Sequence, residues 1–405
     1  MGERKSKQQL ERIKKKYNVD QLWSFSKFNT YRTDKFGFML KYIRHEKETK
    51  TSIWGVSGGG IHDIIERFYT KEIAYEEMLP QYEDKLFNMN LAELKYNRKD
   101  EEANRKLGDK YEANIRLFFQ QHQIIPFKLI TEQFVTIKIG KYVFQGYIDG
   151  VFKDDKGIYN IIDWKSSTMY VGKKVQKESA QLVLYAESLI QKGIPIEQIS
   201  IKWNFLKYCL IEYQLKGIDK ETKLHKVKTT KGLRTEYVCK LENNLKMWLK
   251  ESGYDELEIE DMVQTAIENN NLDNMPKEIS EKYNVSDCYV GIPLTQDVVD
   301  DLKSNVKETL DEININTHEY NQLMLMVKET DDKKIQNKYI ELAEDLFWTE
   351  IDSTNQFFFN NLCGYSAKQH KPYKQYLDSL DFFVKEEYKS SSKENEEDDD
   401  WLKDL

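Results

Sequence analysis

Two aspartates and a lysine on neighbouring predicted strands have the types and spacing that metal-dependent hydrolysis requires. In the segment YVFQGYIDGVFKDDKGIYNIIDWKSS, a three-residue loop ending at Gly157 would place this glycine in the left-handed conformation common in such hairpins. The ladder that this loop fixes places Asp149 directly opposite Asp163. Lys165 follows Asp163 by two residues and therefore projects from the same face of its strand.

This set of side chains calls for a divalent cation. Directly opposed residues have Cβ atoms about 4.5 to 5.5 Å apart, so the two carboxylates would repel each other unless a cation lay between them. Oxygen ligands favour a hard ion, Mg²⁺ or Mn²⁺, that keeps some of its waters. Coordination lowers the pKa of such a water, and a nearby ammonium can orient it and stabilise charge that develops on a phosphate. The matching reaction is phosphodiester hydrolysis, although a D-x-K tripeptide is also compatible with ordinary residues at a sheet edge.

Two further pairs have helical spacing. His62 and Glu66 lie at i and i+4, directly after the glycines of SGGG, and an imidazole can bind Mn²⁺. Gln181 and Tyr185 have the same spacing on the helix predicted after the lysine strand. Each pair is equally compatible with an ordinary amphipathic helix.

Helices are predicted on both sides of these strands. The pattern indicates a charged helix over residues 3–17 and a second helix capped by Ser24 or Ser26. Three glycines at 58–60 are expected to interrupt the chain, so that the next helix begins near Ile61. Residues 82–122 read as largely helical, ending before Pro126. One face of that region is predicted to carry Leu107, Tyr111, Ile115 and Phe118.

The period changes to two after residue 126. It predicts a three-stranded meander over 131–139, 142–152 and 158–164, then a helix over 178–193 and a strand over 199–215. The fold class is therefore mixed α/β, with a central mixed sheet flanked by helices. We expect four parts: a basic N-terminal helix (1–22), a core (23–250) with a helical insertion around 61–122, a mainly helical region (251–388) and a flexible acidic tail (389–405).

Charge is unevenly distributed along the 405 residues, whose formal net charge is -8. Residues 394–405 contribute -6, whereas residues 1–16 carry +5 and residues 201–250 carry +7. Basic patches, or simply solvated basic faces, are therefore expected. The chain has no apolar run of about 20 residues and no signal-like N-terminus, and its four cysteines have no disulfide-like or metal-like spacing. We expect a cytoplasmic protein that does not enter a membrane.

Five segments, in order, resemble the PD-(D/E)XK nuclease superfamily and specifically its RecB-like branch. They are SFSKFNTYRTDKFGFML, GGGIHDIIE, QGYIDGVF, IIDWKSS and AQLVLYAESL, and they cover roughly residues 24–190. The resemblance implies a restriction-endonuclease-like core, to which the strand KWNFLKYCLI would also belong.

The resemblance also implies roles for individual residues. His62 looks like a metal ligand, Asp149 and Asp163 like the metal carboxylates, and Lys165 like the catalytic lysine, while Trp164 would lend its backbone carbonyl to the metal.

Four other positions match less closely defined roles. Gln181 and Tyr185 match the family motif that lies near the active site and positions DNA or the lysine. Glu66 would give further support to the metal, and Glu132 is an acid without one fixed role in the family.

The chain departs from several relatives that bind an iron–sulfur cluster through one N-terminal and three C-terminal cysteines. Its N-terminal helix reads TDKF, and of the C-terminal group only Cys363 is present. We therefore expect no cluster. The sequence also lacks the phosphate-binding loop GxxxxGK[ST], so unwinding of a duplex would require a partner such as a helicase, and a recombinase or single-strand binding protein is a further expected partner.

The functional expectation is a Mg²⁺- or Mn²⁺-dependent DNA exonuclease that serves recombination, repair or phage DNA processing. The alternative is a catalytically silent nucleic-acid-binding or assembly protein on the same scaffold, with the acidic tail as a docking peptide. An RNA target and endonuclease behaviour also remain open, because enzymes that differ in these properties share one scaffold.

Overall fold

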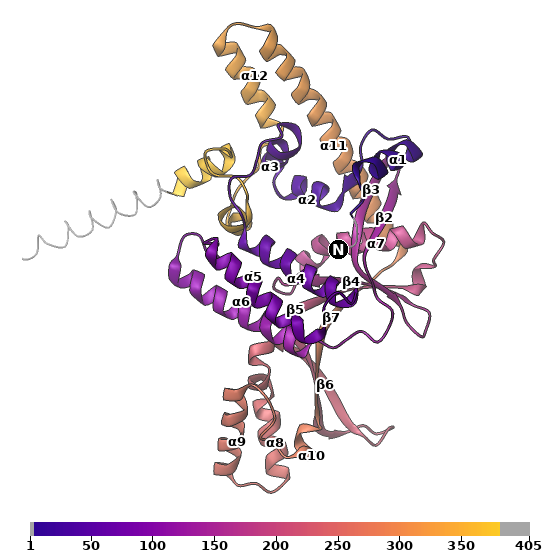
Figure 1. Ribbon diagram of the computed structural model, residues 1–405, viewed down its shortest axis with the longest axis vertical. Coiled ribbons are helices and arrows are strands. Elements are labelled where there is room, and N and C mark those ends of the chain that lie inside the picture. Colours follow the sequence, from indigo (N-terminus) through magenta and orange to yellow (C-terminus); the bar gives the residue numbers. More distant parts are fainter. Residues whose placement is uncertain (1–3, 381–405) are drawn as a thin grey trace, which may run out of the picture. The chain divides into compact units, whose positions relative to one another are not determined.

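A mixed β-sheet is the main feature of the computed structural model, which describes residues 4–380 apart from the side chain of Lys173 (Figure 1). The chain divides into two compact units. The first contains residues up to Leu22 and Val56–Ser304, and the second contains Trp23–Gly55 and the residues from Asn305 onward. The acidic tail lies outside the described residues.

Six strands form the sheet of the first unit. Antiparallel pairs join β2 to β3, β3 to β4, β5 to β6 and β5 to β7, whereas β4 and β5 are parallel. The mixed sheet and the predicted meander are therefore confirmed. The strands are β2 (Ile130–Ile139), β3 (Tyr142–Lys153), β4 (Tyr159–Lys165), β5 (Ile199–Ile218), β6 (His225–Leu233) and β7 (Tyr283–Ile292).

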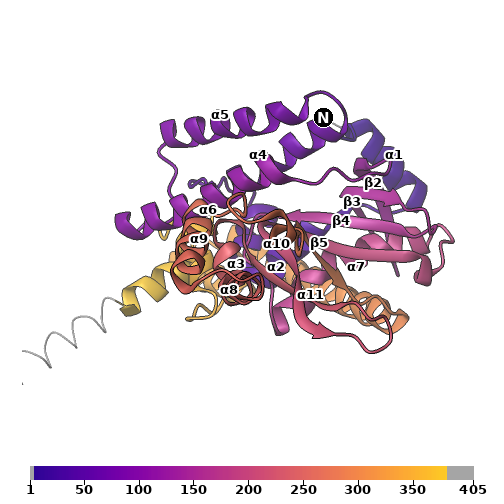
Figure 2. The same cartoon turned by 90° about the horizontal axis from the view of Figure 1, so that it is seen from below.

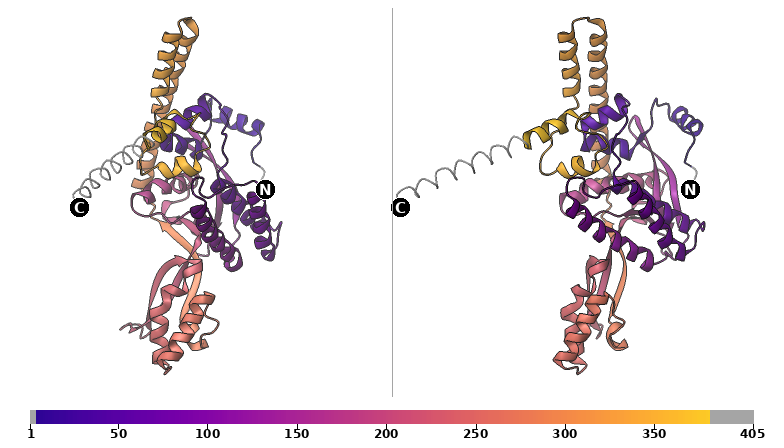
Figure 3. Two further views of the ribbon diagram at one scale, coloured as in Figure 1. Left: turned by 90° about the vertical axis from the view of Figure 1, so that its left-hand side faces the viewer. Right: turned by 60° about the vertical axis from the view of Figure 1, so that its left-hand side comes forward.

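Helices flank this sheet, as expected. A separate group, α8 to α10, packs on the far end of β5 through a core that includes Leu245, Leu249 and Val263, and Figure 3 shows this group at the end of the long strands. The helices that lie wholly or partly in the first unit are α1 (Lys7–Tyr17), α4 (Ile53–Tyr69), α5 (Met78–Leu91), α6 (Glu101–Gln121), α7 (Lys173–Ile190), α8 (Glu242–Glu251), α9 (Glu256–Asn269), α10 (Lys277–Ser280) and α11 (Gln296–Glu329). Short turns of helix are η2 (Tyr75–Glu77), η3 (Ile196–Gln198), η4 (Arg234–Glu236) and η5 (Val238–Leu241).

The predicted interruption at glycines 58–60 is wrong. These glycines lie inside α4, which begins at Ile53. The helix continues because Ile61, Ile64 and Ile65 on its inner face are fully buried, and this packing outweighs the poor helix propensity of glycine. Gly60 also has a packing role, since a Cβ there would lie 2.7 Å from Cδ of Lys85 on α5.

The region 82–122, expected to be largely helical, contains two helices, α5 and α6, separated by residues 92–100. Tyr111, Ile115 and Phe118 face the core as predicted. Leu107, predicted on the same face, is instead 39% exposed.

The second unit is built from short elements near the N-terminus and the C-terminal helices. Ser24 caps its α2, so the prediction of a cap at Ser24 or Ser26 is confirmed for Ser24. Buried Asp34 accepts hydrogen bonds from His370 Nε2, the Gly37 amide and the Thr349 hydroxyl. The bond from His370 connects two residues that are 336 positions apart in the sequence. The elements are β1 (Trp23–Ser24), α2 (Phe25–Thr33), α3 (Lys35–Phe38), η1 (Met39–Ile43), α12 (Lys333–Asp345) and η6 (Phe358–Leu362). Figure 3 shows α11 and α12 lying side by side.

Within residues 4–380, none of the helices combines the length and the apolar character needed to cross a bilayer.

Candidate active site

The β3–β4 hairpin holds the two aspartates close together. Gly157 has a φ of +83°, and the ladder between the strands runs to the pair Gly150 and Ile162, so the predicted register is confirmed. Asp149 and Asp163 occupy the next position beyond this pair, where Oδ2 of Asp149 accepts a hydrogen bond of 3.3 Å from the Trp164 amide. A tight turn thus places two acids from adjacent strands at one point.

Helix α4 brings His62 to the same point. Its Nε2 lies 2.8 Å from the carbonyl oxygen of Trp164, and its Nδ1 lies 3.3 Å from Oδ2 of Asp149. A carbonyl oxygen only accepts hydrogen bonds, so Nε2 carries the hydrogen. In the neutral imidazole, Nδ1 therefore presents a lone pair toward Asp149, and a proton or a cation is needed between the two acceptors.

The charge states of these groups follow from their surroundings. Burial, followed by the negative charge of Asp163, holds the pKa of Asp149 well above its ordinary value. Burial lowers the pKa of His62, and the positive charge of Lys165 adds to this effect against the opposing charge of Asp163. The imidazole is therefore kept neutral, which is the form that binds a metal.

Lys165 extends from the end of β4 toward Asp163. Its Nζ lies 2.7 Å from Oδ2 of Asp163. Burial alone would lower the pKa of Lys165, but the charge of Asp163, with contributions from Tyr170 and Asp149, raises it above its ordinary value. The lysine is therefore an ammonium, which can stabilise negative charge and cannot act as a base.

The donor set fits a divalent cation. Oδ2 of Asp163 is buried and has no hydrogen bond of good geometry beside its ion pair with Lys165, and Nδ1 of His62 has an uncommitted lone pair. Carboxylate oxygens and one imidazole nitrogen are ligands that Mg²⁺ or Mn²⁺ accepts. Between residues 4 and 380, however, no three His, Cys, Asp or Glu side chains form a preformed coordination shell.

Trp164 and the α7 pair complete the predicted set. The Trp164 carbonyl, an expected metal ligand, is engaged by the imidazole of His62. On α7, Nε2 of Gln181 donates a hydrogen bond of 3.2 Å to the hydroxyl of Tyr185. The charges of Asp149, Asp163 and Lys165 all act on Tyr185, so α7 lies beside the acids.

Gly146 belongs to the motif Q-G-Y-I-D, but the sequence did not indicate what this glycine does. A Cβ at this position would lie 2.8 Å from Cε1 of Tyr185, closer than side chains pack. The missing side chain therefore lets the tyrosine ring lie against β3.

Glu66 and Glu132 lie near each other at the edge of this group. Glu66 is 8% exposed, and its charge, together with burial, raises the pKa of Glu132. Glu132 stands across from Asp149 in the β2–β3 register and has a φ of +47°. These two acids add negative charge beside the two aspartates, and their roles remain predictions.

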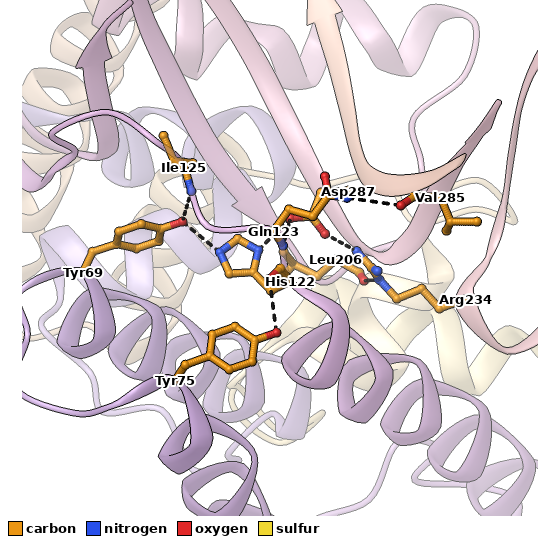
Figure 4. Close-up of polar contacts among 9 residues, drawn as sticks. All are labelled: Tyr69, Tyr75, His122, Gln123, Ile125, Leu206, Arg234, Val285 and Asp287. Carbon is orange, nitrogen blue, oxygen red and sulfur yellow. Dashed lines mark hydrogen bonds and ion pairs between the residues drawn. The ribbon is translucent and has the colours of Figure 1, made fainter. Parts of the chain in front are cut away.

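A second polar network, centred on buried Asp287, links Tyr69, His122 and Arg234 (Figure 4). His122 Nδ1 lies 2.6 Å from Oδ2 of Asp287, and Arg234 donates to the other oxygen of Asp287 at 2.6 Å. The hydroxyl of Tyr69 lies 2.8 Å from Nε2 of His122, and the Tyr69 ring stacks on Trp164 with 6.3 Å between centroids. The network thus ties β7 to the strand that carries the catalytic candidates. No local sequence signal indicates it, because its members are up to 218 positions apart.

The family model described as the PD-(D/E)XK nuclease superfamily matches residues 22–314, which is more than half of the chain. No curated protein matches the chain.

Proposed function

Because the chain belongs to the PD-(D/E)XK nuclease superfamily, whose members typically use divalent metal ions, we propose that it hydrolyses phosphodiester bonds of DNA with Mg²⁺ or Mn²⁺. The observation that carries this proposal is the 2.7 Å ion pair between Lys165 and Asp163, formed where Asp149 meets β4. A buried pair of acids is costly to the fold, and a bound cation would offset that cost.

In this proposal each residue has a defined task. Asp149, Asp163 and Nδ1 of His62 hold the ion, with the Trp164 carbonyl as a further oxygen ligand. The bound ion would supply a water of lowered pKa and polarise the phosphate. Lys165, kept cationic by its neighbours, orients the attacking water and stabilises the negative charge that develops on the phosphate oxygens.

The remaining predicted residues would act around this centre. Gln181 and Tyr185 are proposed to position the DNA or the lysine, since their hydrogen bond fixes both side chains beside the acids. Glu66 is proposed as support for the metal.

The finer proposal is an exonuclease of the RecB-like, phage type that acts in recombination, repair or phage DNA processing. It is supported by the ordered segments SFSKFNTYRTDKFGFML, GGGIHDIIE, QGYIDGVF, IIDWKSS and AQLVLYAESL. A helicase, a recombinase or a single-strand binding protein would be the partner, because the sequence contains no phosphate-binding loop of its own.

The test uses end-labelled linear DNA and closed circular DNA, each single- and double-stranded, with either metal. We expect linear DNA to be degraded from an end while closed circles stay intact. Cleavage of the circles would replace the exonuclease proposal with an endonuclease. No cleavage of any substrate would favour a silent nucleic-acid-binding scaffold.

A further inference from the structure

Helix α1 is fastened to the β2–β3 hairpin at both of its ends (Figure 2). At its N-terminal end, the Lys5 amide donates a 2.6 Å hydrogen bond to the hydroxyl of Tyr147 on β3, and Nζ of Lys5 lies 5.5 Å from the ring centroid of Phe134 on β2. At the other end, the hydroxyls of Tyr17 and Thr136 lie 3.1 Å apart. The helix therefore has a defined place in the first unit.

The N-terminal anchor lies next to the candidate active site. Tyr147 precedes Asp149 by two residues on β3, so their Cα atoms are about 6.6 Å apart and their side chains project to the same side. Arg4 is close as well. Burial and the charge of Glu66 raise the pKa of Glu132, and the charge of Arg4 acts in the opposite direction.

The helix carries a strong positive charge. Residues 4–17 contain seven basic side chains and one acid, Glu11, which pairs with Lys14 at 2.7 Å. The exposed cations are Arg4, Lys7, Arg12, Lys15 and Lys16.

The site itself is rich in acids, with Asp149, Asp163, Glu66 and Glu132 close together. Such a group repels a polyanion unless positive charge nearby compensates for it. The exposed basic helix α1, which is fixed to β2 and β3 beside the acids, supplies such charge.

We propose that α1 is a phosphate-binding strap, which holds the nucleic-acid backbone next to the bond that is cut. This inference rests on the proposed nuclease function. Eleven helical residues span about 16 Å, which corresponds to between four and five base-pair steps of about 3.4 Å along the axis of a DNA duplex. Arg4 and Lys7, at the end nearest Asp149, contact the phosphates closest to the reacting one.

The test compares two pairs of substitutions that remove the same charge. The strap variant is Arg4→Gln/Lys7→Gln, which spares Lys5 and hence the contact with Phe134. The control variant is Lys226→Gln/Lys228→Gln on the exposed strand β6. In the sheet, Lys228 pairs with Tyr213 on β5, and Asp163 pairs with Trp203 on the same strand. Tyr213 and Trp203 are ten residues apart, so the control site lies about 33 Å from Asp163.

Two readouts are measured on the full-length protein. The first is the affinity for a labelled linear DNA duplex in Ca²⁺ across a salt series, and the second is KM and kcat in Mn²⁺. We expect the strap variant to bind about tenfold more weakly near physiological salt, to lose about two units of salt slope, and to show a raised KM with kcat within about twofold. The control variant should keep the salt slope and KM of the unsubstituted protein. A third variant, Arg4→Lys/Lys7→Arg, keeps both positive charges and should also show the salt slope and KM of the unsubstituted protein.

Other outcomes separate the two proposals. Equal effects of the strap and control variants, or no effect of the strap variant, would overturn the strap. A fall in kcat at constant KM would also overturn it, since this would indicate a disturbed site. If the unsubstituted protein cuts nothing but the strap variant alone loses salt-dependent binding, the phosphate-binding role of α1 stands and the nuclease proposal fails.

Discussion

The imidazole of His62 donates its Nε2 hydrogen to the carbonyl oxygen of Trp164, 2.8 Å away. This bond joins α4 to β4 at the residue between Asp163 and Lys165, and it turns the lone pair of Nδ1 toward Asp149. In the neutral imidazole, Nδ1 and the Asp149 carboxylate are both acceptors, so a proton on Asp149 or a cation must lie between them. This arrangement determines how the site responds to pH and to metal.

Replacing Asp149 with Asn should stabilise the metal-free protein. The pKa of Asp149 is raised by burial and by Asp163, so the folded state retains a proton that the unfolded chain releases. This group's contribution to stability is therefore fully present below the unfolded pKa and is lost as the pH rises toward the folded pKa. We expect Asp149→Asn to have a higher Tm than the unsubstituted protein at about pH 8 in EDTA, and the difference to vanish near pH 4, close to the ordinary Asp pKa.

The control is Asp155→Asn, the same substitution in the exposed hairpin loop, which should leave Tm unchanged. An Asp149→Asn protein that is less stable than the unsubstituted one at the higher pH would show that Asp149 is ionised and well paired without a metal.

Metal binding should release a proton from this site. Because burial and the charge of Asp163 raise the pKa of Asp149, a cation must displace the proton wherever the carboxyl still carries it, and the affinity for Mn²⁺ should increase as the pH rises toward the folded pKa. Isothermal titration in two buffers of different ionisation enthalpy measures the number of protons released. We expect about one at the lower pH values. An affinity and a heat that are the same at every pH and in both buffers would contradict this coupling.

A methyl group added at position 146 should disturb the candidate active site through its contact with Tyr185. In Gly146→Ala the new Cβ meets Cε1 of Tyr185, which is 5% exposed and cannot swing away. Overpacking of this kind costs about 1 to 3 kcal/mol, and we expect lower stability together with reduced nuclease activity. Gly291→Ala is the matched control, because Gly291 is also in a strand and a Cβ there would have no atom within 4 Å. Equal activity of the two variants would show that Tyr185 need not be held in place.

The buried polar network around Asp287 should contribute strongly to the free energy of unfolding. Asp287 is buried between His122 and Arg234, and these partners lower its pKa although burial by itself would raise it. Asp287→Asn leaves the Arg234 charge buried and without its ion-pair partner, which costs about 3 to 5 kcal/mol. Urea unfolding measures this loss.

The comparison is Glu236→Gln, which breaks an exposed ion pair with Lys110 and should change the free energy of unfolding by about 1 kcal/mol or less. If both substitutions cost the same, the network does not stabilise the fold as its burial implies.

The sequence predicted the hairpin of the candidate active site well because its register is set locally. Gly157 takes the left-handed conformation and Asp154 accepts hydrogen bonds from the Lys156 and Ile158 amides, so the loop is set locally and the positions of Asp149, Asp163 and Lys165 follow by counting. The alternation of the meander and the helical spacing of Gln181 and Tyr185 are also short-range signals, and the corresponding strands and helix are present.

Features that depend on distant contacts could not be predicted in the same way. Glycines 58–60 look like a helix break, yet the burial of Ile61 and its neighbours keeps α4 continuous. Strand β7 lies in a region that looks mainly helical, and it joins the sheet because β5 offers it an edge. The pairing of His122 with Asp287 requires that same strand, so no pattern near either residue reveals it.

The most direct test of the central claim compares the digestion of end-labelled linear DNA by the unsubstituted protein, Asp163→Asn and Lys165→Gln in Mn²⁺, with Tm measured for each. We predict cleavage by the unsubstituted protein and rates at least about 100-fold lower for both variants, at Tm values that show folded proteins. Undiminished cleavage by both folded variants would contradict the claim, because the acids and the lysine would then not be the site of the reaction.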